Sequence, residues 1–218
     1  MAPIDQATDG SRSAISTSRK SPRRPVVGDE TGGVNHNQID PLLRLLEDFT
    51  PTTEQEATDV ERVIALARAG DPWNRANPLH VTSSGIVVHP PTNRVLLRWH
   101  ERQQAWLQIG GHGDPGETDP IDVALREGAE ETGLSDLVAW PSAVLRHVVI
   151  VPVPANAREP AHEHADLRFF LATNHPDRAV PEKPTAALRW LSTDEAAELT
   201  TEANVRDTIH RVAAAMKR

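Results

Sequence analysis

A glycine-rich turn that leads directly into an acidic helix constrains this 218-residue chain more than any other feature. The segment is 111–134, GHGDPGETDPIDVALREGAEETGL, and its second half holds Glu127, Glu130 and Glu131. Helical residues advance by about 100° each, so the three carboxylates fall within an arc of roughly 100°. Like charges at such spacing destabilise a bare helix by roughly 0.2–0.5 kcal/mol per pair. The segment therefore calls for open solvent or a neutralising cation, and Mg²⁺ prefers oxygen ligands.

The same segment carries its own helix boundaries. Asp119 followed by Pro120 is typical of an N-cap and a first helical residue, and Asp122 lies in the first turn, where the helix dipole favours negative charge. Gly133 supplies a C-terminal stop. A stripe of small and apolar residues beside the glutamates can pack on a sheet. The sequence thus predicts a helix that is packed on one side and acidic on the other. A glutamate-rich helix can also be a solvated face, which the flanking glycines disfavour.

These residues resemble the Nudix box, whose pattern is G-x5-E-x7-REUxEExGU, with U an aliphatic residue. The matching positions are Gly111, Glu117, Arg126, Glu127, Glu130, Glu131, Gly133 and Leu134. Two features depart from the pattern. Eight residues rather than seven separate Glu117 from Arg126, and Gly128 stands at the first U position. The extra residue falls in a turn, which absorbs an insertion more easily than a helix does. Glycine inside a helix costs about 1 kcal/mol relative to alanine, so we interpret Gly128 as a position where the backbone approaches another element closely.

The resemblance implies a Nudix-type α/β/α sandwich with a mixed β-sheet. It also implies hydrolysis of the diphosphate linkage in a nucleoside diphosphate linked to another moiety, X, by attack of water on phosphorus with Mg²⁺ or Mn²⁺. Glu127 and Glu131 are then the expected direct metal ligands, and Glu130 binds directly or through water. The backbone carbonyl of Gly110 is a further candidate. Arg126 is expected to orient the cluster by pairing with Glu117.

Other candidate site residues lie outside the fixed positions of the box. In the family a further acidic residue often supplies a ligand or the general base, and Glu182, before the last expected strand, is the first candidate, with Glu163 the second. His112 beside the glycine turn and His164 are candidates for substrate binding. For each of these residues, a solvated surface role is the alternative.

A second polar group precedes the apolar stretch 167–172. Because alternate residues of a strand point to one face, His162, His164 and Asp166 could converge on a phosphate, a metal or a substrate hydroxyl. Paired histidines also suggest a cupin-like metal site. The glycines and the later glutamate of a cupin pattern are absent, so the sequence favours the Nudix interpretation.

The chain divides by composition into three parts. Residues 1–38 hold few large apolar side chains and are predicted to be a disordered tail with a basic cluster. Residues 39–76 predict an N-terminal helical extension of two helices, expected to pack on the main domain, with a lid or a homodimer contact as alternatives. Residues 77–218 predict the Nudix domain. Within it we expect strands at 81–89, 94–99, 106–109, 144–153, 167–172 and 188–191 and a final helix at 201–217.

Composition limits the chemistry and the partners. The chain has no cysteine, which excludes thiolate ligands and a thiol nucleophile and fits a cytoplasmic location. Its net charge of -8 argues against general nucleic-acid binding, so we expect a small phosphorylated substrate. No apolar run approaches the length of a membrane span. A non-catalytic Nudix-like sensor of a nucleotide or sugar phosphate is the alternative function, although all box carboxylates are present.

Overall fold

The computed structural model describes residues 40–217 except residue 158, so the predicted tail lies outside the described residues. Within them the helices are α1 (Pro41–Glu47), α2 (Glu54–Ala69), α3 (Pro120–Thr132), α4 (Thr193–Leu199) and α5 (Ala203–Met216), with short 3-10 turns at Pro90–Thr92 and Pro176–Arg178. No helix in this part of the chain combines the length and the apolar character needed to cross a bilayer.

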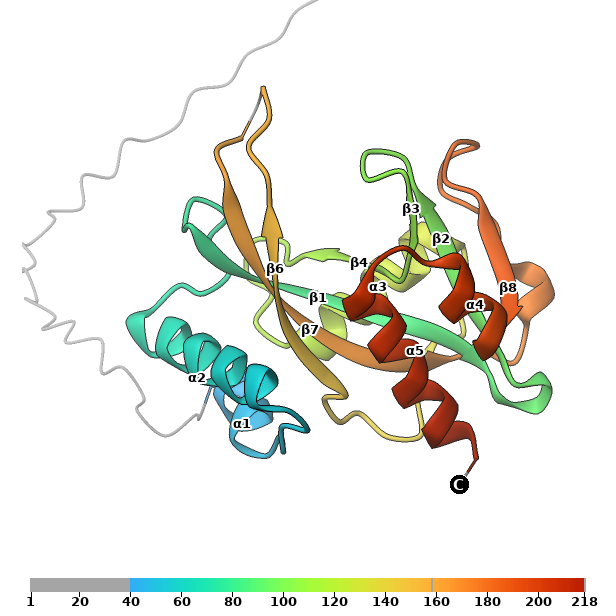
Figure 1. Cartoon of the computed structure of the whole chain (residues 1–218), viewed down its shortest axis with the longest axis horizontal. Helices are drawn as coiled ribbons and strands as arrows, with labels where there is room; N and C mark the ends of the chain where they lie inside the picture. The colour runs from blue at the N-terminus through green and yellow to red at the C-terminus, as the bar shows by residue number, and fades with distance from the viewer. Residues whose placement is uncertain (1–39, 158, 218) are drawn as a thin grey trace, which may run out of the picture. The chain divides into compact units, whose positions relative to one another are not determined.

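The strands form one mixed sheet (Figure 1). They are β1 (Leu79–His89), β2 (Arg94–His100), β3 (Ala105–Leu107), β4 (Ile109–His112), β5 (Val138–Ala139), β6 (His147–Val153), β7 (His162–Ala172) and β8 (Leu188–Ser192). The two long strands β1 and β7 run parallel at its centre, and the other pairings are antiparallel. β4 pairs with β1, so the glycine turn emerges beside the middle of the sheet.

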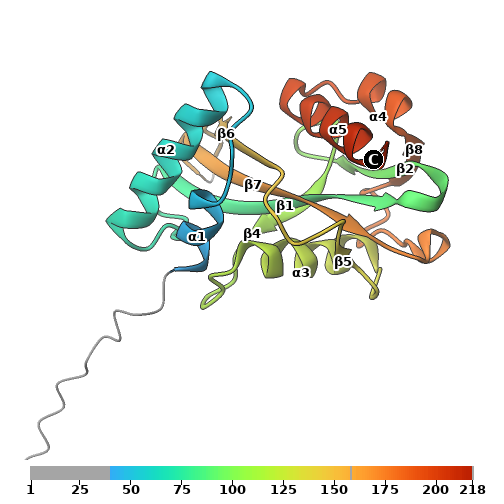
Figure 2. The ribbon, with the colours of Figure 1, turned by 90° about the horizontal axis from the view of Figure 1, so that it is seen from below.

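Helices cover both faces of this sheet, as Figure 2 shows with α3 on one side and α4 and α5 on the other. The core is accordingly split into two clusters. One contains Ala124 of α3 with Ile109 and Leu171, and the other contains Ile209 of α5 with Ile86 and Phe170. The predicted α/β/α sandwich with a mixed sheet is therefore confirmed.

Helix α3 forms where its boundary signals predict. The Asp119 carboxylate accepts the N–H of Ile121, and Gly133 ends the helix in the left-handed region, with φ of 67°. Gly128 does mark a close approach, although to side chains: a Cβ there would lie 2.7 Å from Cδ1 of Leu137. Because Gly128 has no side chain, α3 can pack close to Leu171 and Ile109 of the sheet.

Helix α2 of the N-terminal extension contacts the main domain through buried carboxylates. Glu56 of α2 accepts the N–H of Val148, and Asp59 accepts that of Ile150, both on β6. Arg211 of α5 donates to Glu56 across the same contact. Helix α2 therefore covers backbone groups of β6 that would otherwise lack partners. The boundaries of the extension and the domain stay predictions.

Several predicted elements differ in extent from those observed. The stretch expected at 106–109 is two strands, because Ala105–Leu107 pairs with β2 while Ile109–His112 pairs with β1. Strand β6 begins at His147 rather than at 144. Strand β7 begins at His162, five residues earlier than expected, because parallel pairing with β1 holds its polar first half in the sheet. Helix α4 was not predicted, although Ser192 and Glu195 form a capping box at its start.

Candidate active site

The glutamates of α3 meet the sheet at the glycine pair of β4. The backbone N–H of Gly110 donates to Oε2 of Glu131 over 3.1 Å. A Cβ on Gly111 would lie 2.6 Å from Oε1 of Glu127, so only glycine leaves room for this carboxylate. Helix α3 packs on both β1 and β4, which fixes these contacts. The two glycines are therefore the surface against which the carboxylates rest.

Arg126 connects the remaining acidic residues of the box. It donates to Glu117 over 3.0 Å, so the expected pair forms despite the extra residue in the intervening turn. The same guanidinium lies 3.0 Å from Glu127 and 3.1 Å from Glu130, and it donates to the carbonyl of His112. Arg126 thus ties the loop after β4 to the acidic face of α3.

Arg98 on β2 is a site residue that the sequence did not reveal. Its guanidinium lies 3.2 Å from Glu131 and 3.7 Å from Glu182. The backbone N–H of Glu182 also donates to the carbonyl of Glu131 over 3.3 Å. Glu182, predicted from its position before the last strand, is thereby brought beside the box. Only the register between strands could have placed Arg98 there.

Burial changes the acidity of the two inner glutamates. Burial, with smaller contributions from nearby Glu127 and Glu182, raises the pKa of Glu131 to about 7, against the lowering effects of Arg98 and of the Gly110 N–H. Burial also raises the pKa of Glu127, whereas the guanidinium of Arg126 lowers that of Glu117. Crowded, partly desolvated carboxylates are stabilised by a nearby cation. Carboxylate oxygens are ligands that suit Mg²⁺.

We call Glu127, Glu130, Glu131 and Glu182 the glutamate cluster. It is not a closed set of ligands, since Arg126 and Arg98 hold its members and the Glu130 side chain is 56% exposed. In the described part of the chain, the one group of three or more His, Asp or Glu side chains spaced for a single ion is His80, His162 and His164. The role of the three box glutamates as metal ligands stays a prediction.

A cavity of about 260 Å³ lies beside this site, on the α5 side of the sheet. Gly110 and Gly111 line it and also touch the glutamate cluster. Its polar lining includes Gln108, Arg102, Asp166, Arg168 and Asn204. These residues are further candidates that the sequence did not single out for binding, apart from Asp166.

The cavity floor is held by a buried ion pair. Nε of Arg168 lies 2.7 Å from Asp166, which also accepts from Ser84 and Gln108. Arg168 donates further to both oxygens of Asn204 at the start of α5. Every charge in this network has a partner, so it forms a rigid polar surface.

His112 and His164 both line the cavity, as their candidate role requires. Burial lowers the pKa of His112 to about 3 and that of His164 to about 4, and neighbouring histidines contribute in both cases. Both rings are therefore neutral near pH 7 and bring no positive charge to a phosphate. They can offer a hydrogen bond or a lone pair.

Other candidates from the sequence lie elsewhere. Glu163 pairs with Arg62 of α2, on the opposite face of β7 from His162 and His164. Trp99 and Trp106 contact each other with rings tilted by 59° and centroids 5.6 Å apart. No tryptophan is among the described residues that line the cavity.

The protein combines a mixed sheet between helices with an acidic helix, α3, that packs against the two glycines of β4 and is contacted by arginines. This combination of fold and site can be compared with those of known families. The NUDIX domain family matches residues 79–212, which is more than half of the chain. The chain belongs to the NUDIX domain family.

One curated relative is named "Probable DHNTP pyrophosphohydrolase" and comes from Lactococcus lactis subsp. cremoris. It is 29% identical over 113 residues, which cover 50% of this chain and 64% of that protein. The match thus spans less than two thirds of the relative's length.

Among solved structures, the dihydroneopterin triphosphate pyrophosphohydrolase of E. coli is similar with a TM-score of 0.49 and 22% identity, over 62% of this chain and 94% of that one. An Ap4A hydrolase of C. elegans has a TM-score of 0.49 and 17% identity, over 62% and 95% of the two chains. The names of these relatives refer to different substrates.

Proposed function

We propose that this protein hydrolyses a diphosphate linkage in a nucleoside diphosphate linked to X, or in a related organic pyrophosphate, with Mg²⁺ as cofactor. The observation that carries the proposal is the setting of Glu131, which is buried against Gly110 and adjoins Glu127 and Glu182. An anionic substrate would be repelled by these carboxylates without a metal ion. Bound Mg²⁺ supplies charge neutralisation of the diphosphate and makes water a better nucleophile.

In this proposal Glu127 and Glu131 hold the ion, with Glu130 and the carbonyl of Gly110 as further ligands. Mn²⁺ is the alternative cation. Arg126 positions the cluster through its contacts with Glu117, Glu127 and Glu130. Glu182 is the candidate to accept the proton of the attacking water or to complete the ligand set. Its approach to Glu131 through Arg98 supports this role over that of Glu163.

The cavity supports a polar substrate group beside the diphosphate. Arg102 brings a positive charge, and Asn204 and Gln108 bring amide groups. Oε1 of Gln108 is buried without a partner among the described residues, so it can accept a hydrogen bond from a ligand. The name of the Lactococcus relative adds dihydroneopterin triphosphate to the substrates worth testing.

The test is turnover of a panel of diphosphate compounds with Mg²⁺, comparing Glu131→Gln with the matched control Glu198→Gln on the exposed face of α4. We expect Glu131→Gln to lower kcat by about 1000-fold, equivalent to ~4 kcal/mol, while the control keeps full activity. Circular dichroism checks that both remain folded. Full activity of a folded Glu131→Gln would overturn the mechanism. Tight binding of a compound without any product would favour the sensor function.

A further inference from the structure

A cluster of four histidines lies next to the glutamate cluster, and none of the four is among the proposed Mg²⁺ ligands. We call it the histidine cluster: His80 of β1, His112 of β4, and His162 and His164 of β7. The parallel register sets His80 opposite His164, and His162 lies two residues earlier on the same face of β7. The ring centroids of His80, His162 and His164 lie 4.9 to 5.2 Å apart.

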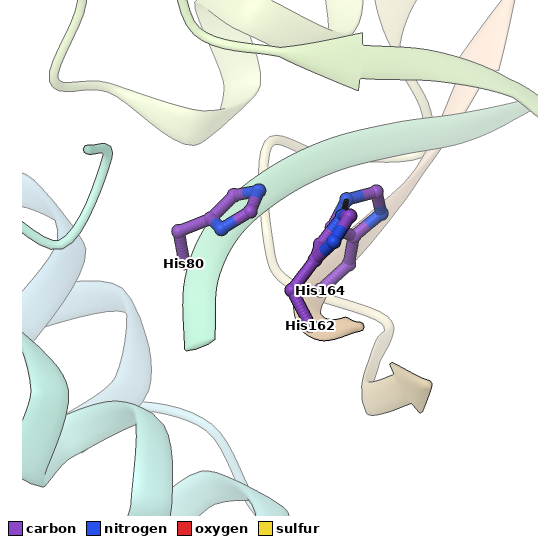
Figure 3. A group of neighbouring side chains, drawn as sticks. All are labelled: His80, His162 and His164. Atoms are coloured by element: carbon purple, nitrogen blue, oxygen red, sulfur yellow. Dashed lines mark hydrogen bonds between the residues drawn. The ribbon is translucent and has the colours of Figure 1, made fainter. Parts of the chain in front are cut away.

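Three of these rings are spaced for a single metal ion (Figure 3). One ligand nitrogen from each of His80, His162 and His164 lies within 4.8 Å of the other two, and Nε2 of His162 is 3.1 Å from Nε2 of His164. Zinc binds imidazole nitrogen at about 2.0–2.1 Å in tetrahedral geometry, which sets neighbouring ligand nitrogens about 3.3 Å apart. One edge of such a tetrahedron is already formed, and small side-chain rotations would complete a face.

Backbone carbonyls orient two of the rings as metal ligands require. Nδ1 of His80 lies 3.0 Å from the carbonyl oxygen of Asn77, and Nδ1 of His162 lies 2.9 Å from that of Pro160. A carbonyl oxygen can only accept, so both Nδ1 atoms carry the proton and both Nε2 atoms present a lone pair. Metal-binding histidines generally use their second nitrogen in this way.

The orientation of the rings favours a metal ion over an anion. The Nε2 atoms of His80 and His162 present lone pairs toward neighbouring rings, and a lone pair attracts a cation but repels a phosphate oxygen. Nε2 of His112 lies 3.1 Å from Nε2 of His80, next to the three ligands, where it can complete a fourth position.

We propose that His80, His162 and His164 form a second metal site, selective for cations that prefer imidazole, with Zn²⁺ as the leading candidate. Ligand chemistry separates it from the glutamate cluster, because imidazole suits zinc and carboxylate oxygen suits magnesium. Since His164 and His112 line the cavity, a bound ion would lie at its wall. The proposal does not depend on the hydrolytic function.

The test uses the full-length chain with any affinity tag removed and metals stripped by a chelator. Zn²⁺ is then titrated in competition with a chromophoric chelator in the presence of excess Mg²⁺. We expect one tightly bound Zn²⁺ per chain, with affinity reduced by at least about 100-fold in His162→Gln, since one of three ligands is lost. His162 is only half-buried, so the variant should fold. The control His210→Gln removes an exposed histidine of α5 and should leave affinity unchanged.

Two further measurements decide the outcome. Glu131→Gln should retain the zinc affinity, because its carboxylate belongs to the other cluster. In the unmodified chain, imidazole NMR signals of the histidine cluster should shift on addition of Zn²⁺ but not of Mg²⁺. Absence of zinc binding, equal affinity in His162→Gln, or loss of binding in Glu131→Gln would each overturn the proposal and identify the four rings as a hydrogen-bonded structural cluster.

Discussion

The glutamate cluster and the histidine cluster lie on either side of the same short strand, β4, but they differ in charge and in what holds their side chains in place. Glu131 and Glu127 rest against Gly110 and Gly111, and arginines offset their charge. On β4 the next residue, His112, joins the histidine cluster, in which burial lowers the pKa of His112 and of His164. One region is charged and held by ion pairs, and the other is uncharged and held by ring contacts and carbonyls.

This difference explains why the two regions suit different cations. Hard carboxylate oxygens match Mg²⁺, which takes oxygen ligands in octahedral geometry and keeps several waters, whereas imidazole lone pairs match zinc. It also explains why the chain can place them side by side, since neutral rings do not compete with the arginines for the glutamates. The predictions below ask whether the two regions are separable, beginning with the largest expected effect.

Gly110→Ala should damage both regions at once. The residue has φ of 144°, and a Cβ would lie 2.2 Å from Cβ and 2.5 Å from Cα of Ser84, so β4 must move away from β1. Because that clash is with backbone and cannot relax by rotation, we expect a loss of at least ~3 kcal/mol in the free energy of unfolding. Denaturant titration measures it.

Two glycine controls sharpen this result. Gly70→Ala shares the left-handed backbone, with φ of 91°, but its Cβ would meet nothing within 4 Å, so only the backbone cost of about 1–2 kcal/mol remains. Gly111→Ala meets the flexible end of Glu127 and should lower activity while sparing stability and zinc binding. Equal stability of the Gly110 and Gly70 variants would show that β4 is not the shared support.

Arg126→Lys should impair the glutamate cluster alone. Lysine keeps the charge but cannot bridge Glu117, Glu127 and Glu130 as the planar guanidinium does. We expect kcat/KM to fall by about 100-fold, as for a misplaced catalytic group, with zinc affinity unchanged. Arg68→Lys on the exposed face of α2 is the matched control. A parallel loss of zinc binding would show that the two clusters are coupled.

Glu182→Gln tests whether the acidic region extends beyond the box. Arg98 links Glu182 to Glu131, so we expect activity to fall by about 10-fold, the effect typical of a group supporting a metal site. Glu163→Gln is the comparison, because that carboxylate pairs with Arg62 and should leave turnover unchanged. A larger loss of kcat in Glu163→Gln than in Glu182→Gln would contradict this prediction. The acidic residue outside the box would then be Glu163, which lies between His162 and His164 in the sequence.

The sequence predicted the two regions unequally for physical reasons. The three box glutamates lie on one helix, so local periodicity and capping were enough to place them on one face, whereas the Arg126–Glu117 pair was expected from the resemblance to the Nudix box. Arg98 reaches Glu131 only through the placement of β2 in the sheet. Glu182 reaches it from the loop before β8, and its position in the chain rather than any contact identified it. His80 was missed entirely, because its nearness to His164 depends on the parallel register of β1 and β7.

The same reasoning accounts for the misjudged start of β7. Its first residues are polar, so hydrophobic alternation marks only the half from Leu167 onward. The parallel ladder with β1 runs from Glu163 to Ala172 and keeps the polar half extended. Long-range pairing thus overrides a local pattern that indicates a loop.

His147→Gln separates the consequence of burial from that of clustering. This ring is 5% exposed, contacts Thr208 and Asp207, and faces Arg168, Arg211 and Glu56, with no second histidine. Burial lowers the pKa of His147 to about 4 in the folded chain. Below pH 6.5, the ordinary pKa of histidine, this side chain is protonated in the unfolded chain but stays neutral in the folded chain until about pH 4. Stability should therefore fall as pH drops from about 6.5 towards 4.

Between about pH 7.5 and 5.5 we expect His147→Gln to remove about 1 kcal/mol of this fall in denaturant titrations, whereas the exposed control His210→Gln removes none. An unchanged pH slope in His147→Gln would assign acid sensitivity to the histidine cluster instead.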